Sequence, residues 1–330
     1  MIWLAWRQHR GQLLSAAVAF GLLAVFLFVT GTSMRHTSTA SGLSGCLDQV
    51  GGASMVNFVK GEGCRELGDA FAARYFGLRL LGLVLFTVVP LLVGMFWGAP
   101  LIARESERGT DALVWTQSVS RRRWASTEFA MVASMTIIAV GTYAVLVMWW
   151  YAPLNAATGE RFQWLIFDQQ GSVPVGYALF AFALGVLAGA ITGRTLRAMA
   201  VTVVGFLVVR FAVAVWLRPH YLAALQRKYP VMSSTEPNRL LGDWLIGGGG
   251  PGVGAVYDAL GHKLKGGQMM CPPPVAQACI DQVGRGAYNF EIYQPAHRFW
   301  AFQSIETAIF VALAIVLLFV AAWWLEHRMA

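Results

Sequence analysis

The sequence has 330 residues, of which 57% are hydrophobic and 13% are charged. Soluble domains carry about 25% charged residues, so this composition excludes an ordinary soluble enzyme and predicts a polytopic membrane protein. The formal net charge of +8 does not indicate nucleic-acid binding. No RNA- or DNA-binding motif accompanies it, and many basic residues flank apolar runs, where they orient the chain and meet membrane lipid.

The N-terminal residues mix two tryptophans with the basic residues Arg7, His9 and Arg10. This combination predicts a short helix in the membrane interface over residues 1–12. The apolar run that follows predicts a first transmembrane helix over residues 13–31. A cleaved signal peptide is the alternative, but the run is long and no clear small-x-small cleavage site follows it.

The rest of the chain alternates between apolar runs and polar connections. Five more runs are long enough to cross a bilayer, which predicts an all-α polytopic protein with six transmembrane helices. The further predicted segments are an outer segment over 32–75, a second helix over 76–102, an inner loop over 103–124, a third helix over 125–151, an outer loop over 152–172, a fourth helix over 173–193, an inner turn over 194–197, a fifth helix over 198–217, an outer domain over 218–298, a sixth helix over 299–325 and an inner tail over 326–330.

Several residues inside the predicted helices constrain the packing. Pro90 and Pro100 predict kinks in the second helix, and the carbonyl groups that they leave without helical hydrogen bonds need a partner on a neighbouring helix. Arg79 lies near the outer end of the same helix, where it can snorkel toward water. In the fourth helix, Gly185 and Gly189 form a small-xxx-small pair that allows close helix approach, although such pairs are common by chance.

The inner loop over 103–124 fixes the predicted orientation. It contains five arginines, Arg104, Arg108, Arg121, Arg122 and Arg123. Arginine in a short loop marks the cytoplasmic side, because moving this charge through hydrocarbon is costly. Together with basic residues at other inner span ends, the loop predicts that both termini are cytoplasmic. Glu105 and Glu107 near its start, and the apolar residues 113–115, favour a short helix for a cytoplasmic partner over a solvated turn.

The outer domain is too polar to cross a membrane. Residues 221–230 predict a short amphipathic helix, the glycine-rich residues 246–255 predict a flexible turn, and residues 271–279 predict a constrained loop. The glycine run is rejected as a nucleotide site because it is outside and follows no predicted strand.

The four cysteines lie in segments predicted to be outside, with Cys46 and Cys64 in one and Cys271 and Cys279 in the other. This distribution favours the disulfides Cys46–Cys64 and Cys271–Cys279 in an oxidising compartment. Pairing between the two segments, or free or metal-bound thiols, are the alternatives. The spacing is not that of a zinc site, so no metal site is predicted.

Two charged residues lie inside predicted helices, Arg210 in the fifth and Glu306 in the sixth. Both lie about two turns below the outer end, so we expect them to form an intramembrane ion pair. A structural pair is favoured over a role of either residue in substrate selection. Glu128, at the inner start of the third helix, is expected to contact Arg121–Arg123 or to favour the helix N-terminus, and a cap is favoured over a catalytic acid.

Three stretches carry a family resemblance: MIWLAWRQHR at 1–10, ARESERGTDALVWTQSVSRRRW at 103–124 and YQPAHRFWAFQSIE at 293–306. With them the chain resembles ABC-2-type permeases, the membrane subunits of ABC exporters, and is most similar to those common in actinobacteria. The loop is the most specific stretch, since Glu105, Gly109, Thr110, Ser120 and Arg121 match the family pattern. Ser118 and the pair Thr127–Glu128 depart from it. The resemblance covers the whole chain in the number and order of spans.

The resemblance implies an ABC-2 exporter (type V-like) fold in a bacterial plasma membrane, with residues 1–12 as an interfacial elbow helix. It also implies a coupling helix that contacts the ATPase subunit through Arg104, Glu105, Glu107, Arg108, Gly109, Thr110, Asp111 and Leu113. The expected partners are two copies of an ABC ATPase subunit, a second identical or homologous permease chain and membrane lipid. The expected substrate is a small hydrophobic compound, either an antibiotic or other drug, or a lipid.

The sequence has no Gly-x-x-x-x-Gly-Lys-Ser/Thr motif, so we expect no catalytic residue or cofactor in this chain, with ATP and Mg bound by the partner. A sensor or assembly subunit that signals through an ATPase without transport is the main alternative function. A membrane enzyme is less favoured, because His220, His262 and His297 are scattered and no HExxH or GxSxG motif is present.

Overall fold

The computed structural model describes residues 2–50, 58–108, 121–231, 243–246, 254–267, 269 and 276–327. Within this part, six helical segments are long and apolar enough to cross a membrane. They are α1 (Ile2–Ala40), the series α4 (Phe76–Val93), η2 (Gly94–Gly98) and α5 (Ala99–Arg108), then α7 (Arg121–Thr158), α9 (Val173–Thr192), the pair α10 (Thr195–Ala212) and η3 (Val213–Leu217), and α12 (Phe299–His327). The prediction of a helical membrane protein with six spans is confirmed.

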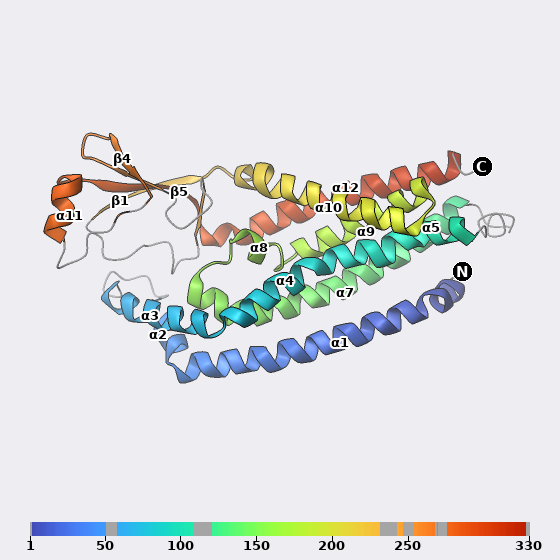
Figure 1. The fold of residues 1–330 in the computed structure, drawn as a ribbon, viewed down its shortest axis with the longest axis horizontal. Helices are drawn as coiled ribbons and strands as arrows, with labels where there is room; N and C mark the ends of the chain where they lie inside the picture. Colours follow the sequence, from blue (N-terminus) through green and yellow to red (C-terminus); the bar gives the residue numbers. More distant parts are fainter. Residues whose placement is uncertain are drawn as a thin grey trace.

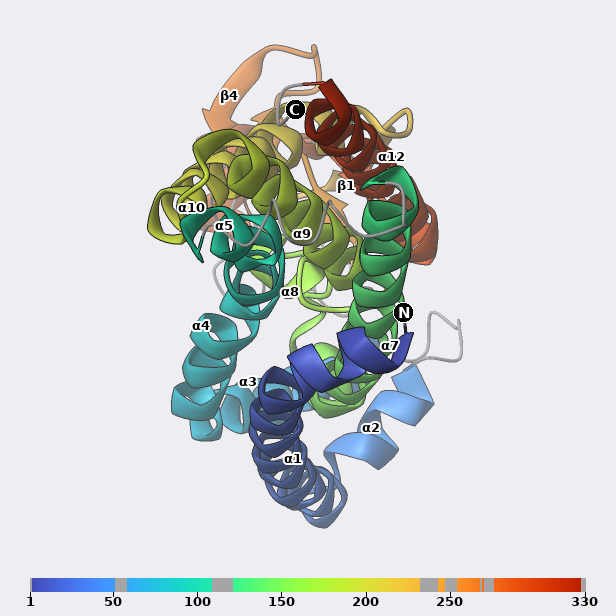
Figure 2. The same ribbon diagram turned by 90° about the vertical axis from the view of Figure 1, so that its right-hand side faces the viewer.

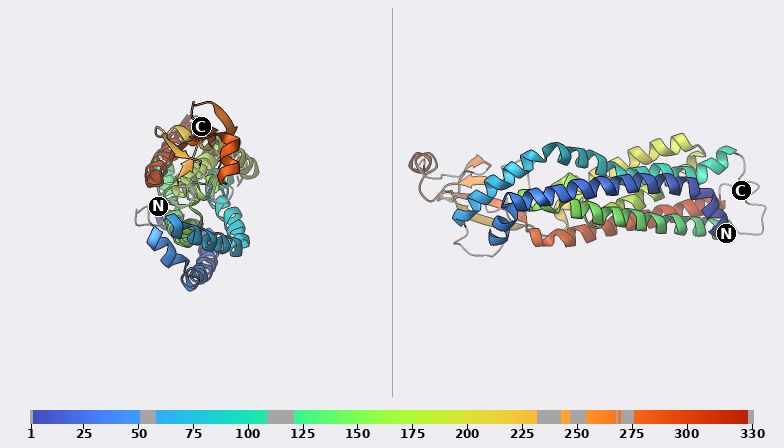
Figure 3. Two further views of the ribbon diagram at one scale, coloured as in Figure 1. Left: turned by 90° about the vertical axis from the view of Figure 1, so that its left-hand side faces the viewer. Right: turned by 90° about the horizontal axis from the view of Figure 1, so that it is seen from below.

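The six segments lie side by side in an elongated bundle (Figure 1). Both termini lie at one end, together with α5, and we call this the termini end (Figures 1 and 3). The opposite end, here the sheet end, carries α2 (Leu43–Val50), α3 (Phe58–Arg74) and a small β-sheet. Large apolar side chains such as Leu22 and Phe319 are exposed on the outside of the bundle, as expected for helices that face lipid.

The helix α9 lies at the centre of the bundle and contacts α4, α5, α7, α10 and α12 (Figure 2). Close packing on one side depends on glycine. A Cβ atom added at Gly185 would lie 2.5 Å from the carbonyl oxygen of Gly94, and one at Gly189 would lie 2.7 Å from that of Ala99. The predicted small-xxx-small pair is therefore a site of backbone contact, and η2, a single π-helical turn, lies against it.

Two prolines free carbonyl groups that neighbouring helices satisfy. Pro90 in α4 cannot donate to Phe86, and the Phe86 carbonyl instead accepts a hydrogen bond from the Tyr143 hydroxyl of α7 at 3.0 Å. Pro153 likewise frees the carbonyl of Trp149 in α7, and this carbonyl accepts a hydrogen bond from Arg35 of α1. In a membrane such substitutes are required, because no water is present to bond the exposed carbonyl.

The helices extend further than predicted from hydropathy. The expected elbow helix over 1–12 is continuous with α1, although its first turns bend away from the rest of α1 (Figure 2). The segment 32–75 is largely helical: α1 continues to Ala40, and α2 and α3 form a hairpin after Gly42, whose φ is +77°. Hydropathy finds only the lipid-embedded part of a helix, so its polar ends are missed.

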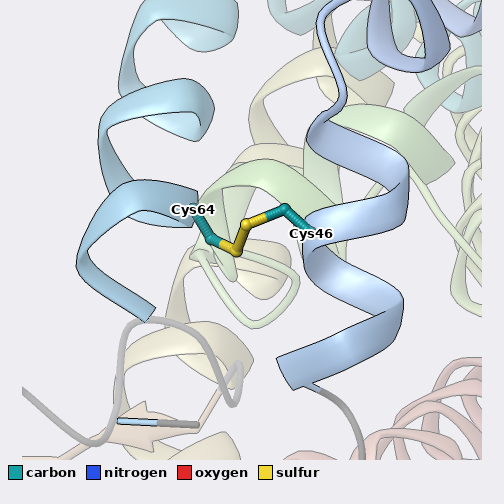
Figure 4. Close-up of a disulfide and its surroundings, with 2 residues drawn as sticks. All are labelled: Cys46 and Cys64. Carbon is teal, nitrogen blue, oxygen red and sulfur yellow. A yellow bond between two sulfur atoms is a disulfide. The ribbon is translucent and has the colours of Figure 1, made fainter. Parts of the chain in front are cut away.

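A disulfide between Cys46 and Cys64 joins α2 to α3, with 5.7 Å between the Cα atoms (Figure 4). This is one of the two predicted pairs. The other, Cys271–Cys279, involves Cys271, which lies outside the described residues.

The sheet end contains a five-stranded antiparallel sheet in the order β1-β5-β3-β4, with β2 also paired to β5. The strands are β1 (Leu225–Pro230), β2 (Trp244–Leu245), β3 (Ala255–Tyr257), β4 (Lys263–Gly266) and β5 (Tyr288–Gln294). The chain enters it from η4 (Arg218–His220) and leaves it through η5 (Ala296–Arg298), and α11 (Ala276–Val283) lies beside it (Figure 1).

The amphipathic helix predicted over 221–230 is wrong, because β1 occupies most of this stretch and pairs with β5. Tyr229 is buried between exposed Lys228 and Pro230, an alternation that fits a strand, and proline is tolerated because β1 is an edge strand. The glycine-rich residues 247–253 and residues 271–275 lie outside the described part of the chain, and Ala276 begins α11 rather than continuing a loop.

We expect Gly185→Ala to lower the melting temperature in detergent, because the new Cβ would clash with the Gly94 backbone. Overpacking of this kind costs about 1–3 kcal/mol. Gly141→Ala in α7 is the matched control, since nothing lies within 4 Å of a Cβ at that position, and it should leave the melting temperature equal or slightly higher. Equal melting temperatures for the two variants would contradict the tight crossing of α4–η2–α5 and α9.

Candidate functional site

The connection between α7 and α9 is buried at the sheet end of the bundle. Residues 152–172 were predicted to form an outer loop, but α7 extends to Thr158 and the short helix α8 (Trp164–Phe167) leads into a buried polar run. Asp168, Gln169 and Gln170 have exposed fractions of 3%, 1% and 0%. Three consecutive polar residues are buried here because each finds hydrogen-bond partners on the surrounding helices.

Hydrogen bonds of the two glutamines hold the connection against α4 and α7. The Gln169 amide donates to the carbonyl of Leu83 at 2.9 Å and to the Thr87 hydroxyl at 2.7 Å, and its oxygen accepts from the Tyr151 hydroxyl at 2.9 Å. Gln170 accepts a hydrogen bond from the Asn155 amide at 2.8 Å.

Gln303 of α12 completes these contacts. Its oxygen accepts from the backbone N–H of Val173 at 3.0 Å, and its amide donates to the Phe167 carbonyl at 3.0 Å. The turn from α8 into α9 is therefore held by side chains of three helices.

Asp168 is the centre of a buried charge network, defined as Asp168, Arg210, Arg218 and Glu306. Arg210 donates to one carboxylate oxygen of Asp168 from Nε at 2.9 Å and from Nη2 at 2.7 Å, and Arg218 forms an ion pair with the other oxygen. Arg218 also donates to Glu306 from Nε at 2.8 Å and from Nη2 at 2.6 Å. The exposed fraction of every side chain in the network is 9% or less.

The network is neutral and nearly saturated with hydrogen bonds. Two guanidinium groups face two carboxylates, and the hydroxyls of Tyr177 and Tyr221 both donate to Glu306. Burial, followed by the negative charge of Glu306, raises the pKa of the Tyr221 phenol, so this group remains a protonated donor. An ion in a low-dielectric interior is tolerated when it is paired in this way.

A π-helical turn places the two arginines on the same side of the fifth span. Eight residues of regular α-helix would rotate Arg218 by about 80° away from Arg210. The turn η3 lies between them, and its i→i+5 hydrogen bonds wind more residues into one turn and reduce this rotation. Both guanidinium groups can then reach Asp168.

The predicted direct pair of Arg210 and Glu306 is corrected. Both residues belong to the network, but Arg210 pairs with Asp168, and Glu306 pairs with Arg218. In the sequence, Asp168 lies in the predicted outer loop over 152–172 and Arg218 directly follows the predicted fifth helix, so neither stands out as a charge inside a span. The available signal was an acidic residue followed by two glutamines directly after the apolar residues Trp164–Phe167.

At the termini end, α5 contains four of the residues expected to contact the ATPase, namely Arg104, Glu105, Glu107 and Arg108; the others, Gly109, Thr110, Asp111 and Leu113, lie outside the described residues. The four continue the second span instead of starting a separate helix. Glu107 contacts its own chain: one carboxylate oxygen accepts from the backbone N–H of Thr195 at 2.8 Å, and the other accepts from the Thr195 hydroxyl at 2.9 Å.

The prediction for Glu128 is also corrected. The helix α7 begins at Arg121, so Glu128 lies about two turns inside it and cannot cap its N-terminus. The helix continues into the arginine run, which hydropathy had assigned to the loop.

Arg79, expected to snorkel, forms an ion pair with Glu160 and donates a hydrogen bond to the side-chain oxygen of Gln163 at 3.0 Å. The Glu160 side chain is 40% exposed, so this pair is a partly solvated counterpart of the buried network. Among the residues that the structure describes, no group of three or more His, Cys, Asp or Glu side chains has the arrangement of a metal site.

We expect Glu306→Gln to destabilise the folded protein by about 3 kcal/mol, because it leaves Arg218 with unbalanced charge in the interior. Glu160→Gln removes the same charge from an exposed pair and should cost less than about 1 kcal/mol. Thermal unfolding of both variants in one detergent measures the difference. A Glu306→Gln protein as stable as the Glu160→Gln protein would show that the network contributes no more than a surface pair.

Comparison with known proteins agrees with this architecture. The family model described as "ABC-2 membrane transporter related" matches residues 17–218, a stretch from α1 to the end of the fifth span that includes Asp168, Arg210 and Arg218. No curated protein and no solved structure matches the chain. Because the match covers more than half of the sequence, this protein belongs to the ABC-2 membrane transporter related family and is a multi-pass permease component of an ABC transporter, a family that works with an ABC ATPase subunit.

Proposed function

We propose that this chain is the permease subunit of an ABC exporter that moves a small hydrophobic compound, an antibiotic or other drug or a lipid, out across a bacterial plasma membrane. The observation that carries the proposal is the family match over residues 17–218, which spans the second transmembrane segment, the arginine-rich connection and the helices α7, α9 and α10.

The proposed orientation places the termini end in the cytoplasm. Arg104 and Arg108 lie in α5, and Arg121, Arg122 and Arg123 begin α7. Arginines on both sides of a short connection favour the cytoplasmic side. The sheet end is then outside, where an oxidising environment would maintain the Cys46–Cys64 disulfide.

The proposed partners are two ATPase subunits and a second permease chain, identical or homologous. ATP and Mg would be bound by the ATPase subunits, because this sequence lacks the phosphate-binding Gly-x-x-x-x-Gly-Lys-Ser/Thr motif. The region around residues 104–113 would contact the ATPase, so that closure of the ATPase pair moves the second and third spans as rigid bodies.

The pairing of the buried charges with one another supports a hydrophobic substrate. The guanidinium groups of Arg210 and Arg218 are already engaged by Asp168 and Glu306, so they are poorly suited to bind a charged substrate. Exposed apolar side chains such as Val204 and Phe211 on α10 offer surface of the kind that a lipid-soluble compound contacts.

The test is reconstitution with an ABC ATPase subunit from the same organism. The complex is inserted into vesicles, and the export of a fluorescent hydrophobic dye and of a short-chain fluorescent phospholipid is measured with and without ATP. We expect ATP-dependent loss of at least one probe, abolished when the Walker A lysine of the ATPase is replaced. A complex that hydrolyses ATP but moves neither probe would instead support the sensor function, and failure to associate with the ATPase would contradict both.

Orientation gives a separate prediction. We expect a membrane-impermeant maleimide to label Leu260→Cys, in the exposed turn between β3 and β4, on intact cells. Arg194→Cys, in the turn between α9 and α10 at the termini end, should be labelled only after permeabilisation. The unmodified chain reports the background from its native cysteines. The opposite labelling pattern would invert the proposed topology.

A further inference from the structure

The first turn of α10 is held by a side chain from another span. The chain turns sharply from α9 to α10 at Gly193, whose φ is +58°. The N-cap residue, Arg194, makes no side-chain capping hydrogen bond in the described structure. Glu107 of α5 supplies the cap from outside by accepting hydrogen bonds from both the backbone N–H and the hydroxyl of Thr195.

The physical chemistry of a helix N-terminus favours this contact. The first amides of a helix have no partner within the helix, and the aligned peptide dipoles attract negative charge there. A carboxylate that accepts two hydrogen bonds satisfies both requirements and fixes the direction from which it approaches. The contact therefore joins α5 to α10 more specifically than apolar packing alone.

Small residues bring the same helices close together. Ala99 of α5, Ala188 of α9 and Ala198 of α10 form a buried cluster, so the backbones approach closely about two turns from Glu107 along α5 and one turn from Thr195 along α10. Side chains this short cannot interlock strongly by shape, which leaves the polar contact to determine how the end of α10 follows α5.

The opposite end of α10 belongs to the buried charge network. Thr195 and Arg210 are fifteen residues apart on one continuous helix, a separation of about 22 Å at 1.5 Å per residue. Arg210 is bonded to Asp168 through two nitrogen atoms. A single rigid helix thus connects a contact at the termini end with the charge network at the sheet end.

We propose that Glu107 is a positioning residue that transmits movement of α5 to α10, and through α10 to the Arg210–Asp168 pair. The resemblance implies that Glu107 contacts the ATPase, and the structure adds a contact of Glu107 within the permease itself. The inference rests on the proposed function, since an ATPase has to move α5. The second and fifth spans also pack through the small residues Ala99 and Ala198, and the turn at Gly193 and Arg194 joins α10 to α9.

The experiment measures movement of α10 in the complex with the ATPase in lipid nanodiscs. Spin labels are introduced with a keto amino acid at Leu196, exposed in the first turn of α10, and at Ile138, exposed on α7. The distance between them is compared without nucleotide and after trapping with ATP and vanadate. In the otherwise native complex we expect a nucleotide-dependent change in this distance.

The test variant is Glu107→Ala, and Thr195→Val removes the hydroxyl donor from the other side. Loss of a helix cap changes a local equilibrium about fivefold, so we expect each variant to lose at least half of the nucleotide-dependent change while it still copurifies with the ATPase. Glu107→Gln keeps one acceptor oxygen and should be intermediate. Glu66→Gln changes an exposed carboxylate on α3, at the sheet end, and should retain the full change.

The outcomes separate the two levels of the proposal. A Glu107→Ala complex with the full distance change would overturn the role of Glu107, as would a wild-type complex in which nucleotide moves nothing at Leu196. Absence of any association between wild-type permease and ATPase would instead overturn the proposed function. If Glu107→Ala fails to fold, the milder Glu107→Gln and Thr195→Val variants decide, and an undiminished change in both contradicts the inference.

Discussion

Charge pairing in an apolar interior is the interaction on which this fold depends. An unpaired guanidinium or carboxylate between transmembrane helices is costly, and four such groups lie together at the sheet end. Asp168 contacts both Arg210 and Arg218, while Arg218 also contacts Glu306. To place Asp168 there, the connection between α7 and α9 has to fold back into the bundle. The need to pair these charges thus determines the path of the connection between α7 and α9, and it links α10 to α12.

The same reasoning explains many polar contacts outside the buried charge network. Backbone groups that would bond to water in a soluble protein need a protein partner within the bundle. Tyr143 supplies one beside Pro90, Arg35 supplies one beside Pro153, and Gln303 satisfies two groups at the turn into α9. These side chains come from neighbouring helices, so each hydrogen bond to such a backbone group also links two spans. The helices are therefore positioned by polar groups as well as by packing.

Because α9 lies at the centre of the bundle, these links between spans can transmit movement from one helix to another. Its glycines allow the second span to approach within backbone contact, and the buried charge network links the neighbouring helices at the sheet end. The fifth span is then fixed at two places, by Glu107 at Thr195 and by Asp168 at Arg210. In an ABC transporter, movement of the ATPase on one side of the membrane has to change the structure of the permease on the other side. A helix that is held near both ends is suited to transmit this movement.

The class of protein, the number of spans and the family resemblance are all predictable from the sequence. These follow from long apolar runs, arginine at span ends and local motifs, all of which are readable along the chain. The sequence also identified Gly185, Gly189 and Pro90 correctly as packing features, since their effects are local to the backbone. Helix ends were placed too short, because hydropathy reports the lipid-embedded part and not the polar continuation.

Which charged and polar groups contact one another depends on the three-dimensional fold. Arg210 and Glu306 were recognised as costly charges, yet their partners Asp168 and Arg218 come from a connection and a span end that look solvated in the sequence. Their pairing depends on a buried loop and on the π turn η3, neither of which leaves a periodic signal. The strand over Leu225–Pro230 was missed for the same reason, since its conformation depends on pairing with β5, more than fifty residues away along the chain. Contacts between distant segments are selected by the free energy of the whole fold, whereas local pattern reports only the propensity of each segment.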